Sequence, residues 1–201
     1  SLQGFDFSLL DGCDVFVVNK SATFVRQPKY FVTMDYSFLK KCPQVVHNLP
    51  SSTSRVFVVA LDVPYLKERD GRVIDTRFDM VYDLALFDTV IKSRRKRGLG
   101  RELQEFASGW NSGFCALQLA ITLGYSRVVL LGIDLNAGTK THFHGGYGEP
   151  QETFTKKLND YYESFKEGLR PELLNGQKIF NCSKGSRLTE LIGYTDIQEL
   201  L

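Results

Sequence analysis

Polar side chains suited to ligand binding follow the apolar runs that read as β-strands. The residues directly after these runs are Asn19, Asp35, Asn48, Asp62 and Asp134. The carboxyl ends of parallel strands meet at one edge of a sheet, and ligands bind outside that edge, so these side chains would gather around one site. Asn and Asp also favour the turns that follow strands. The pattern therefore supports either a ligand site or a set of ordinary turn residues.

The glycine-rich loop after Asp134 contains His142 and His144. An unperturbed imidazole has a pKa of about 6.5, so either histidine is suited to act as a general base or to contact a phosphate. Two histidines separated by one residue could also bind a metal ion together with Asp134. A structural role is the third alternative, and the spacing does not choose among the three.

A basic run covers residues 92–101, where six of ten residues are Lys or Arg and two are Gly. Such a run is typical of a solvated mobile loop. It would also suit a lid that closes over phosphates, because arginine forks match phosphate oxygens and glycine permits hinge motion. Nucleic acid or an anionic membrane surface is a weaker alternative, since no aromatic residue within the run could stack on bases.

Composition indicates one cytoplasmic α/β domain. The 201 residues, 43% of them apolar, suffice for a single core, and a net charge of +2 gives no reason to expect nucleic-acid binding. The four cysteines form no CxxC pair, so we expect reduced thiols. No apolar run reaches the ~18 residues that span a bilayer, so stable membrane insertion is not expected. The oligomeric state is not indicated.

The central element that would position the site begins at Asn111 or Ser112, either of which can cap a helix. This helix is apolar on nearly all sides, which predicts deep burial, and Gly124 ends it. Residues 127–133 then form an apolar run typical of a strand buried on both faces of a parallel sheet. Asp134 follows this strand directly.

The remaining elements are read from shorter patterns. Further strands are predicted at 14–19, 29–35, 44–48, 55–62 and 178–182. Helices are predicted at 36–41 and 154–169, with one or two more within 189–201. Residues 63–110 read as an irregular insertion or lid. Ser183 and Arg187 follow the last strand at an expected helix start, where hydroxyl, amide and guanidinium groups could bind an anion.

Several segments resemble a known pair of protein families. Asn111-Ser112-Gly113, Leu123-Gly124-Tyr125 and Leu131-Gly132-Ile133-Asp134 resemble the central signature of bacterial CMP-sialic-acid-dependent sialyltransferases and of the related 6-hydroxymethylpterin diphosphokinase-like domains. The segments 30–35, 140–145 and 181–187 also resemble the diphosphokinase-like domains. One departure is Gly109, where the sialyltransferases have Arg. The resemblance implies a single Rossmann-like three-layer domain over residues 1–201.

The same resemblance implies a transferase with a nucleotide-activated donor, most of all a CMP-sugar, that modifies a surface glycan or protein. His142 or His144 would be the catalytic base. The donor site would be formed by Asn19, Asp35, Asn111, Ser112, Gly113 and Asp134. Ser183 could contact an anion, and either Arg187 or the basic run would offset the charge of the leaving phosphate.

Two alternatives remain open. The first is a Mg²⁺-dependent diphosphokinase that acts on a pterin-like alcohol with ATP, with Asp35 and Asp134 as metal ligands. The second is a non-catalytic accessory or binding module. In both families a first strand leads into a glycine-rich phosphate loop, and only Ser1-Leu2 resembles the tail of that loop here. We therefore expect the first strand and the phosphate loop to precede residue 1.

Overall fold

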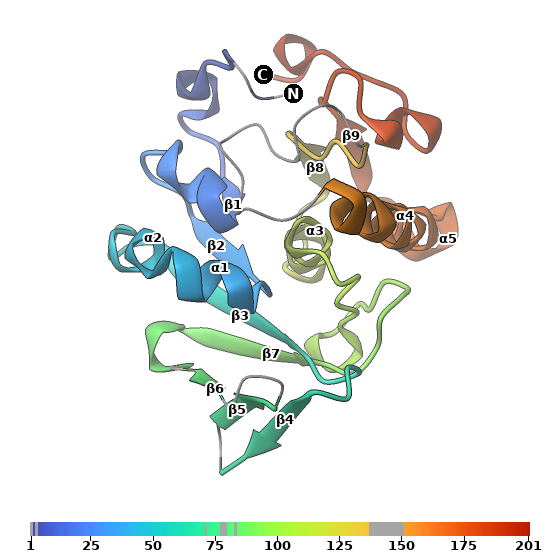
Figure 1. The fold of residues 1–201 in the computed structure, drawn as a ribbon. Coiled ribbons are helices and arrows are strands. Elements are labelled where there is room, and N and C mark those ends of the chain that lie inside the picture. The colour runs from blue at the N-terminus through green and yellow to red at the C-terminus, as the bar shows by residue number, and fades with distance from the viewer. Residues whose placement is uncertain (1, 3, 71, 77–79, 83, 137–150) are drawn as a thin grey trace.

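A four-stranded parallel sheet is the largest sheet among the described residues (Figure 1). The computed structural model describes residues 2, 4–70, 72–76, 80–82, 84–136 and 151–201. The strand order is β1-β2-β3-β7, and each neighbouring pair is parallel. The strands are β1 (Phe16–Val18), β2 (Tyr30–Thr33), β3 (Ser54–Ala60) and β7 (Thr89–Ser93). The predicted mixed α/β fold with a mostly parallel sheet is confirmed at this level.

Both faces of this sheet are covered. Successive strand residues point to opposite faces, and the neighbours Phe31 and Val32 are both fully buried. Phe31 packs in a cluster with Phe38, which belongs to α1 (Tyr36–Lys41), and with Val46 of α2 (Pro43–His47). Val32 belongs to a different cluster, together with residues of α3 (Ser112–Thr122). The helices therefore form layers on either side of the sheet.

The two ends of helix α3 and its deep burial agree with the prediction. Asn111 Oδ1 accepts a hydrogen bond from the Phe114 N–H at 2.9 Å, and Gly124 follows the helix with a φ of +85°. Every residue from Ser112 to Ile121 is buried. One side of α3 packs on the four-stranded sheet, and the other side packs with Leu130. The helix thus lies between two separate parallel sheets.

The second parallel sheet contains β8 (Arg127–Leu130) and β9 (Lys178–Asn181). Helices α4 (Gln151–Gly168) and α5 (Pro171–Leu174) lie on the same side of the molecule (Figure 1). The prediction of a strand at 127–133 that is buried on both faces is wrong. Arg127 is exposed and Val129 is 36% exposed, so the face of β8 that carries these two side chains is open to solvent.

Two other predictions need correction. The expected strand at 44–48 is helical, because Pro43 occupies the first helical turn, where its missing N–H is tolerated, and Val45 and Val46 face the core. The region 63–110 was expected to be an insertion or lid, but part of it, β7, is a strand of the four-stranded sheet. Before β7 come the antiparallel strands β4 (Leu66–Arg69), β5 (Arg72–Asp75) and β6 (Met80–Tyr82).

Short 3₁₀ turns complete the fold. They span Phe7–Leu10, Asn19–Thr23, Leu84–Leu86, Leu103–Glu105, Arg187–Glu190 and Ile197–Glu199. The helices expected within 189–201 are therefore short turns. Within the described part of the chain, no helix combines the length and the apolar character that crossing a membrane requires.

The position of α3 between the two sheets predicts a large loss of stability when its core is truncated. Leu117 is 2% exposed, and Leu117→Ala should lower the free energy of unfolding by about 2–5 kcal/mol, because it removes buried methyl groups and leaves a cavity. Urea denaturation measures the change. Leu123→Ala is the control, since Leu123 at the end of the same helix is 46% exposed. Equal losses for the two variants would contradict the central role of α3.

Candidate functional site

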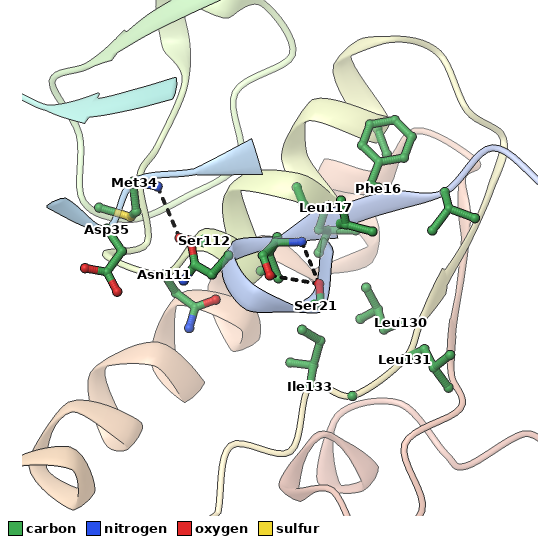
Figure 2. Close-up of a pocket in the computed structure, with 18 of the residues that line it drawn as sticks. Phe16, Ser21, Met34, Asp35, Asn111, Ser112, Leu117, Leu130, Leu131 and Ile133 are labelled. Atoms are coloured by element: carbon green, nitrogen blue, oxygen red, sulfur yellow. Dashed lines mark hydrogen bonds between the residues drawn. The ribbon is translucent and has the colours of Figure 1, made fainter. Parts of the chain in front are cut away.

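A cavity of about 1450 Å³ lies between the four-stranded sheet and β8 (Figure 2). It brings together strand-end residues and the amino end of α3. The predicted site residues that line it are Asn19, Asp35, Asn111, Ser112, Gly113 and Asp134. Asn19 and Asp35 follow neighbouring strands of the four-stranded sheet, and Asp134 follows β8 of the second sheet, so the three line one cavity from two sheets. Asn48 follows a helix and does not belong to this set.

Asn19 is held in place at the carboxyl end of β1. Its Oδ1 accepts a hydrogen bond of 2.7 Å from the Thr33 hydroxyl, which in turn accepts from the backbone N–H of Asp35 at 3.1 Å. Asn19 has a φ of 50°, a left-handed conformation that Asn tolerates better than most residues. The short chain of bonds fixes the ends of β1 and β2 relative to one another, and the amide nitrogen of Asn19 is the group left to contact a ligand.

Asp35 caps α1. Its Oδ1 accepts a hydrogen bond from the Phe38 N–H at 3.0 Å. A short acceptor side chain at this position satisfies one of the amide hydrogens left free in the first turn. The cap uses one carboxylate oxygen and orients the side chain at the cavity wall.

Asn111 and Ser112 both have structural roles at the start of α3. Asn111 caps the helix, and the buried Ser112 hydroxyl accepts a hydrogen bond from the Met34 N–H at 3.1 Å (Figure 2). This bond ties the end of β2 to the start of α3. A ligand at this point would therefore meet the first-turn N–H groups of the helix rather than these side-chain acceptors.

Gly113 permits close packing at the start of α3. A Cβ at this position would lie 2.7 Å from Ile133 Cδ1 and 3.0 Å from Asn111 Oδ1. The first turn of α3 therefore lies directly against the segment that follows β8. A larger residue would have to displace the terminal methyl group of Ile133.

The segment that contains Asp134 is fixed by hydrogen bonds from residues that follow β9. Its carbonyl oxygen accepts hydrogen bonds from the Arg187 N–H at 2.8 Å and from the Ser186 hydroxyl at 3.2 Å. The Ser183 hydroxyl accepts from the Ile133 N–H at 3.1 Å. Ser183 and Arg187 thus buttress the Asp134 segment, and neither is among the described residues that line the cavity.

The Arg187 guanidinium is engaged with α4 and the 3₁₀ turn that follows β9. It donates to Asn159 Oδ1 at 2.7 Å, stacks 3.9 Å from the centre of the Tyr162 ring and lies 3.8 Å from Glu190 Oε1. Tyr162 donates to Glu190 at 2.9 Å. Desolvation and this bond to the Glu190 carboxylate raise the pKa of the Tyr162 hydroxyl. The arrangement explains Arg187 as a packing residue and gives no support to a phosphate contact.

Lys96 brings the basic run to the cavity rim. Its Nζ lies 3.1 Å from Asp160 Oδ1 and 3.8 Å from the centre of the Trp110 ring. Trp110 and Asp160 both line the cavity. Arg97 pairs with Asp160 and with Glu167 of α4. This part of the run is thus anchored to α4, and Lys96 contacts two residues of the cavity lining.

Trp110 is the site residue that the sequence analysis missed. Its indole N–H donates to Asp62 Oδ2 at 3.0 Å, and the residue is 37% exposed. The signal that could have found it is the position of the single tryptophan directly before the cap of α3. An exposed aromatic ring beside a helix amino end offers a flat surface for a nucleobase or a sugar.

At the opposite end of the cavity, Asp14 binds two side chains. It lies 2.6 Å from Lys29 Nζ and accepts a hydrogen bond of 2.6 Å from the Tyr125 hydroxyl. These contacts lower the pKa of the Asp14 carboxyl, with the bond to Lys29 contributing most. Tyr125 directly precedes the 126–130 segment, so this cluster links the start of β1 to the start of β8.

The remaining predicted roles are tested only in part. His142 and His144 lie outside the described residues. Among the residues that are described, no group of three or more His, Cys, Asp or Glu side chains could hold a metal ion. Asp35 and Asp134 line the same cavity, and a Mg²⁺ role for them stays a prediction. All four cysteines are free, and burial raises the pKa of the Cys115 thiol.

Comparisons of the chain with models of protein families, with curated proteins and with solved structures found no match. The resemblance to the sialyltransferases and the diphosphokinase-like domains therefore stays a prediction from short motifs.

The close approach at Gly113 predicts that Gly113→Ala destabilises the protein by about 1–3 kcal/mol, because the added methyl group overpacks a site bounded by Ile133. Thermal and urea denaturation measure the effect. Gly193→Ala is the matched control, since no atom lies within 4 Å of its added Cβ, and its stability should stay within about 0.5 kcal/mol of the parent. A Gly113→Ala protein as stable as the parent would show that the Ile133 side chain shifts to make room for the added methyl group.

Proposed function

We propose that the chain is a transferase with a Rossmann-like fold that binds a nucleotide-activated donor, of the CMP-sugar type, at the carboxyl ends of β1 and β2. The observation that carries the proposal is the shared cavity wall formed by Asn19, Asp35, Asp134 and the amino end of α3. Three separate parts of the chain contribute polar groups to it. The resemblance in the motifs around Ser112 and Asp134 favours a nucleotide-sugar among the possible ligands.

Each part of such a donor has a chemical partner at this site. The phosphate suits the amino end of α3, where unpaired N–H groups and the helix dipole favour negative charge. Lys96 adds a positive charge at the rim. The Trp110 ring, 3.8 Å from Lys96, offers a stacking surface for the base. Asn19, Asp35 and Asp134 can bond the hydroxyl groups of the ribose and the sugar.

The proposed reaction is an inverting transfer. His142 or His144 takes the proton of an acceptor hydroxyl, whose oxygen attacks the anomeric carbon of the donor sugar. The bond from that carbon to the phosphate oxygen breaks, and the nucleotide leaves with the bonding electrons. Lys96 and the amino end of α3 offset its charge. The acceptor is a glycan or a protein hydroxyl.

A Mg²⁺-dependent diphosphokinase is the second candidate, favoured by the two carboxylates, Asp35 and Asp134, on one cavity wall. Oxygen ligands of this kind are those that Mg²⁺ prefers, and the ion would offset the negative charge of the ATP phosphates. The third candidate is an accessory module that binds the nucleotide without catalysis.

Ligand-induced thermal stabilisation separates the candidates. CMP is expected to raise the melting temperature without metal, because a ligand at 100 times its Kd adds about 2.7 kcal/mol of stability. If ATP raises the melting temperature only in the presence of Mg²⁺, and CMP does not raise it at all, the diphosphokinase is favoured. No stabilisation by CMP, CDP, UDP or ATP, with or without Mg²⁺, would contradict a nucleotide site.

Lys96→Ala tests the phosphate contact within this site. It should weaken CMP binding about tenfold by loss of a charge-assisted hydrogen bond, and should leave cytidine binding unchanged. Isothermal titration calorimetry measures both affinities. The control is Lys67→Ala, which removes an exposed lysine of β4, outside the cavity lining. Equal weakening of CMP and cytidine would show that Lys96 acts through Trp110 rather than on phosphate.

The base assignment is tested by His142→Ala and His144→Ala. One of them should lower the transfer rate about 10²-fold or more at unchanged CMP affinity, because general base catalysis contributes factors of this size. Sugar transfer from a donor identified in the ligand screen is the measurement. Two variants with full activity would exclude a histidine base.

A further inference from the structure

The backbone at Trp110 adopts a conformation that a bulky side chain rarely takes. Trp110 has a φ of 51°, and Gly109 directly before it has a φ of 56°. A left-handed φ at a tryptophan costs free energy because its Cβ crowds the backbone, and glycine is the usual residue there. Position 109 has glycine, whereas position 110 has the sole tryptophan of the chain. Strain of this kind persists where the surroundings enforce it, and it is concentrated at functional sites.

Three parts of the fold hold this strained pair of residues. The Gly109 N–H donates to the Lys96 carbonyl of the basic run at 2.8 Å. The Gly109 carbonyl accepts a hydrogen bond of 3.3 Å from the buried hydroxyl of Ser164 in α4. In α3, Phe114 lies so close that a Cβ at Gly109 would be 2.4 Å from its Cδ1. The backbone is therefore fixed, and it places the Trp110 side chain in the cavity lining.

The Trp110 ring is held at its edge and on one face. Its indole N–H donates to Asp62 Oδ2 at 3.0 Å, and Asp62 comes directly after Leu61 at the carboxyl end of β3. The Lys96 ammonium lies 3.8 Å from the ring centre and 3.1 Å from Asp160 Oδ1. A ring fixed in this way has one orientation before a ligand arrives, so little side-chain freedom is lost when a planar group stacks on it.

Asp62 contacts the ring but does not border the cavity. Trp110 is among the described residues that line the cavity, whereas Asp62 is not. The second oxygen of Asp62, Oδ1, is buried and has no hydrogen-bond partner among the described residues. The bond to the indole is therefore the one hydrogen bond that the described part of the chain gives to this carboxylate. Hydrogen bonds to an ionised acceptor are stronger than those to a neutral one, which suits a carboxylate that must hold a large ring.

We propose that Asp62 is a positioning residue of the donor site, which fixes the Trp110 ring as the stacking surface for the base. The identity of the stacked group rests on the proposed function, whereas the fixed ring rests on the contacts of Asp62 and Lys96. The strained backbone places the side chain at the rim, the Lys96 ammonium covers one face of the ring, and the Asp62 carboxylate restricts rotation of the indole.

The indole N–H tests the fixed ring without any ligand. Its single NMR signal should exchange with solvent at least about tenfold faster in Asp62→Ala than in the parent, because the hydrogen bond that protects it is lost. Asp62→Asn keeps an acceptor oxygen and should keep most of the protection. Equal exchange rates in the parent and in Asp62→Ala would overturn the role of Asp62. If Asp62→Ala does not fold, Asp62→Ser replaces it, since its shorter side chain should lose the bond as well.

The affinity for CMP tests what the fixed ring does. Asp62→Ala should weaken CMP binding about fivefold, because a ring that has lost its orientation must be ordered again when the base stacks. The affinity for ribose 5-phosphate, which has no base, should not fall, and NMR titration measures both. Glu102→Ala is the control, since it removes an exposed carboxylate outside the described cavity lining and should change neither affinity. Equal weakening of both ligands by Asp62→Ala would contradict the positioning role.

A double-mutant cycle with Trp110→Phe tests whether Asp62 acts through the indole. Phenylalanine keeps a ring for stacking but has no N–H, so Asp62→Ala should cause no further loss of CMP affinity in the Trp110→Phe protein. A full fivefold loss in that protein would overturn the proposal. If the parent binds no nucleotide, the stacking role is overturned together with the proposed function, whereas the indole exchange still decides whether Asp62 fixes the ring.

Discussion

The burial of α3 on all sides is the constraint on which the rest of the structure depends. A helix without a polar face must be covered everywhere, and here the four-stranded sheet covers one side while β8 and α4 cover the other. The two parallel sheets are therefore held by a common helix rather than by pairing with one another. Asn111, Ser112 and Gly113 lie at the start of this helix, and Asn19, Asp35 and Asp134 follow strands that pack on it.

The polar residues at that first turn serve the fold and the candidate site together. Asn111 and Ser112 use their side chains as acceptors within the protein, and Gly113 permits contact with Ile133. These bonds leave the backbone N–H groups of the turn directed outward from the helix end. A binding site of this kind is rigid before any ligand arrives, which reduces the entropy lost on binding.

Features that are set by a few neighbouring residues, such as helix ends, could be predicted from the sequence. The cap at Asn111 and the stop at Gly124 follow from the preferences of single residues, and both are present. The segment at 44–48 was misassigned because a short apolar run fits a strand and a buried helix equally well. The pairing of Ser112 with Met34 joins residues 78 positions apart, and Lys96 meets Trp110 only through the folded loop. Such contacts leave no periodic pattern in the sequence, so the sequence could indicate residues that line the cavity but not the bonds between them.

The position of Trp110 has a spectroscopic consequence. It is the sole tryptophan of the chain, and it lies on the cavity wall with an ammonium group over its ring. The indole emission of the folded protein therefore originates at the rim of the candidate site and nowhere else. A change in the polarity or charge around that rim alters the whole tryptophan signal, without a background from other indoles. The chain thus carries an intrinsic optical probe at the place where its chemistry is expected.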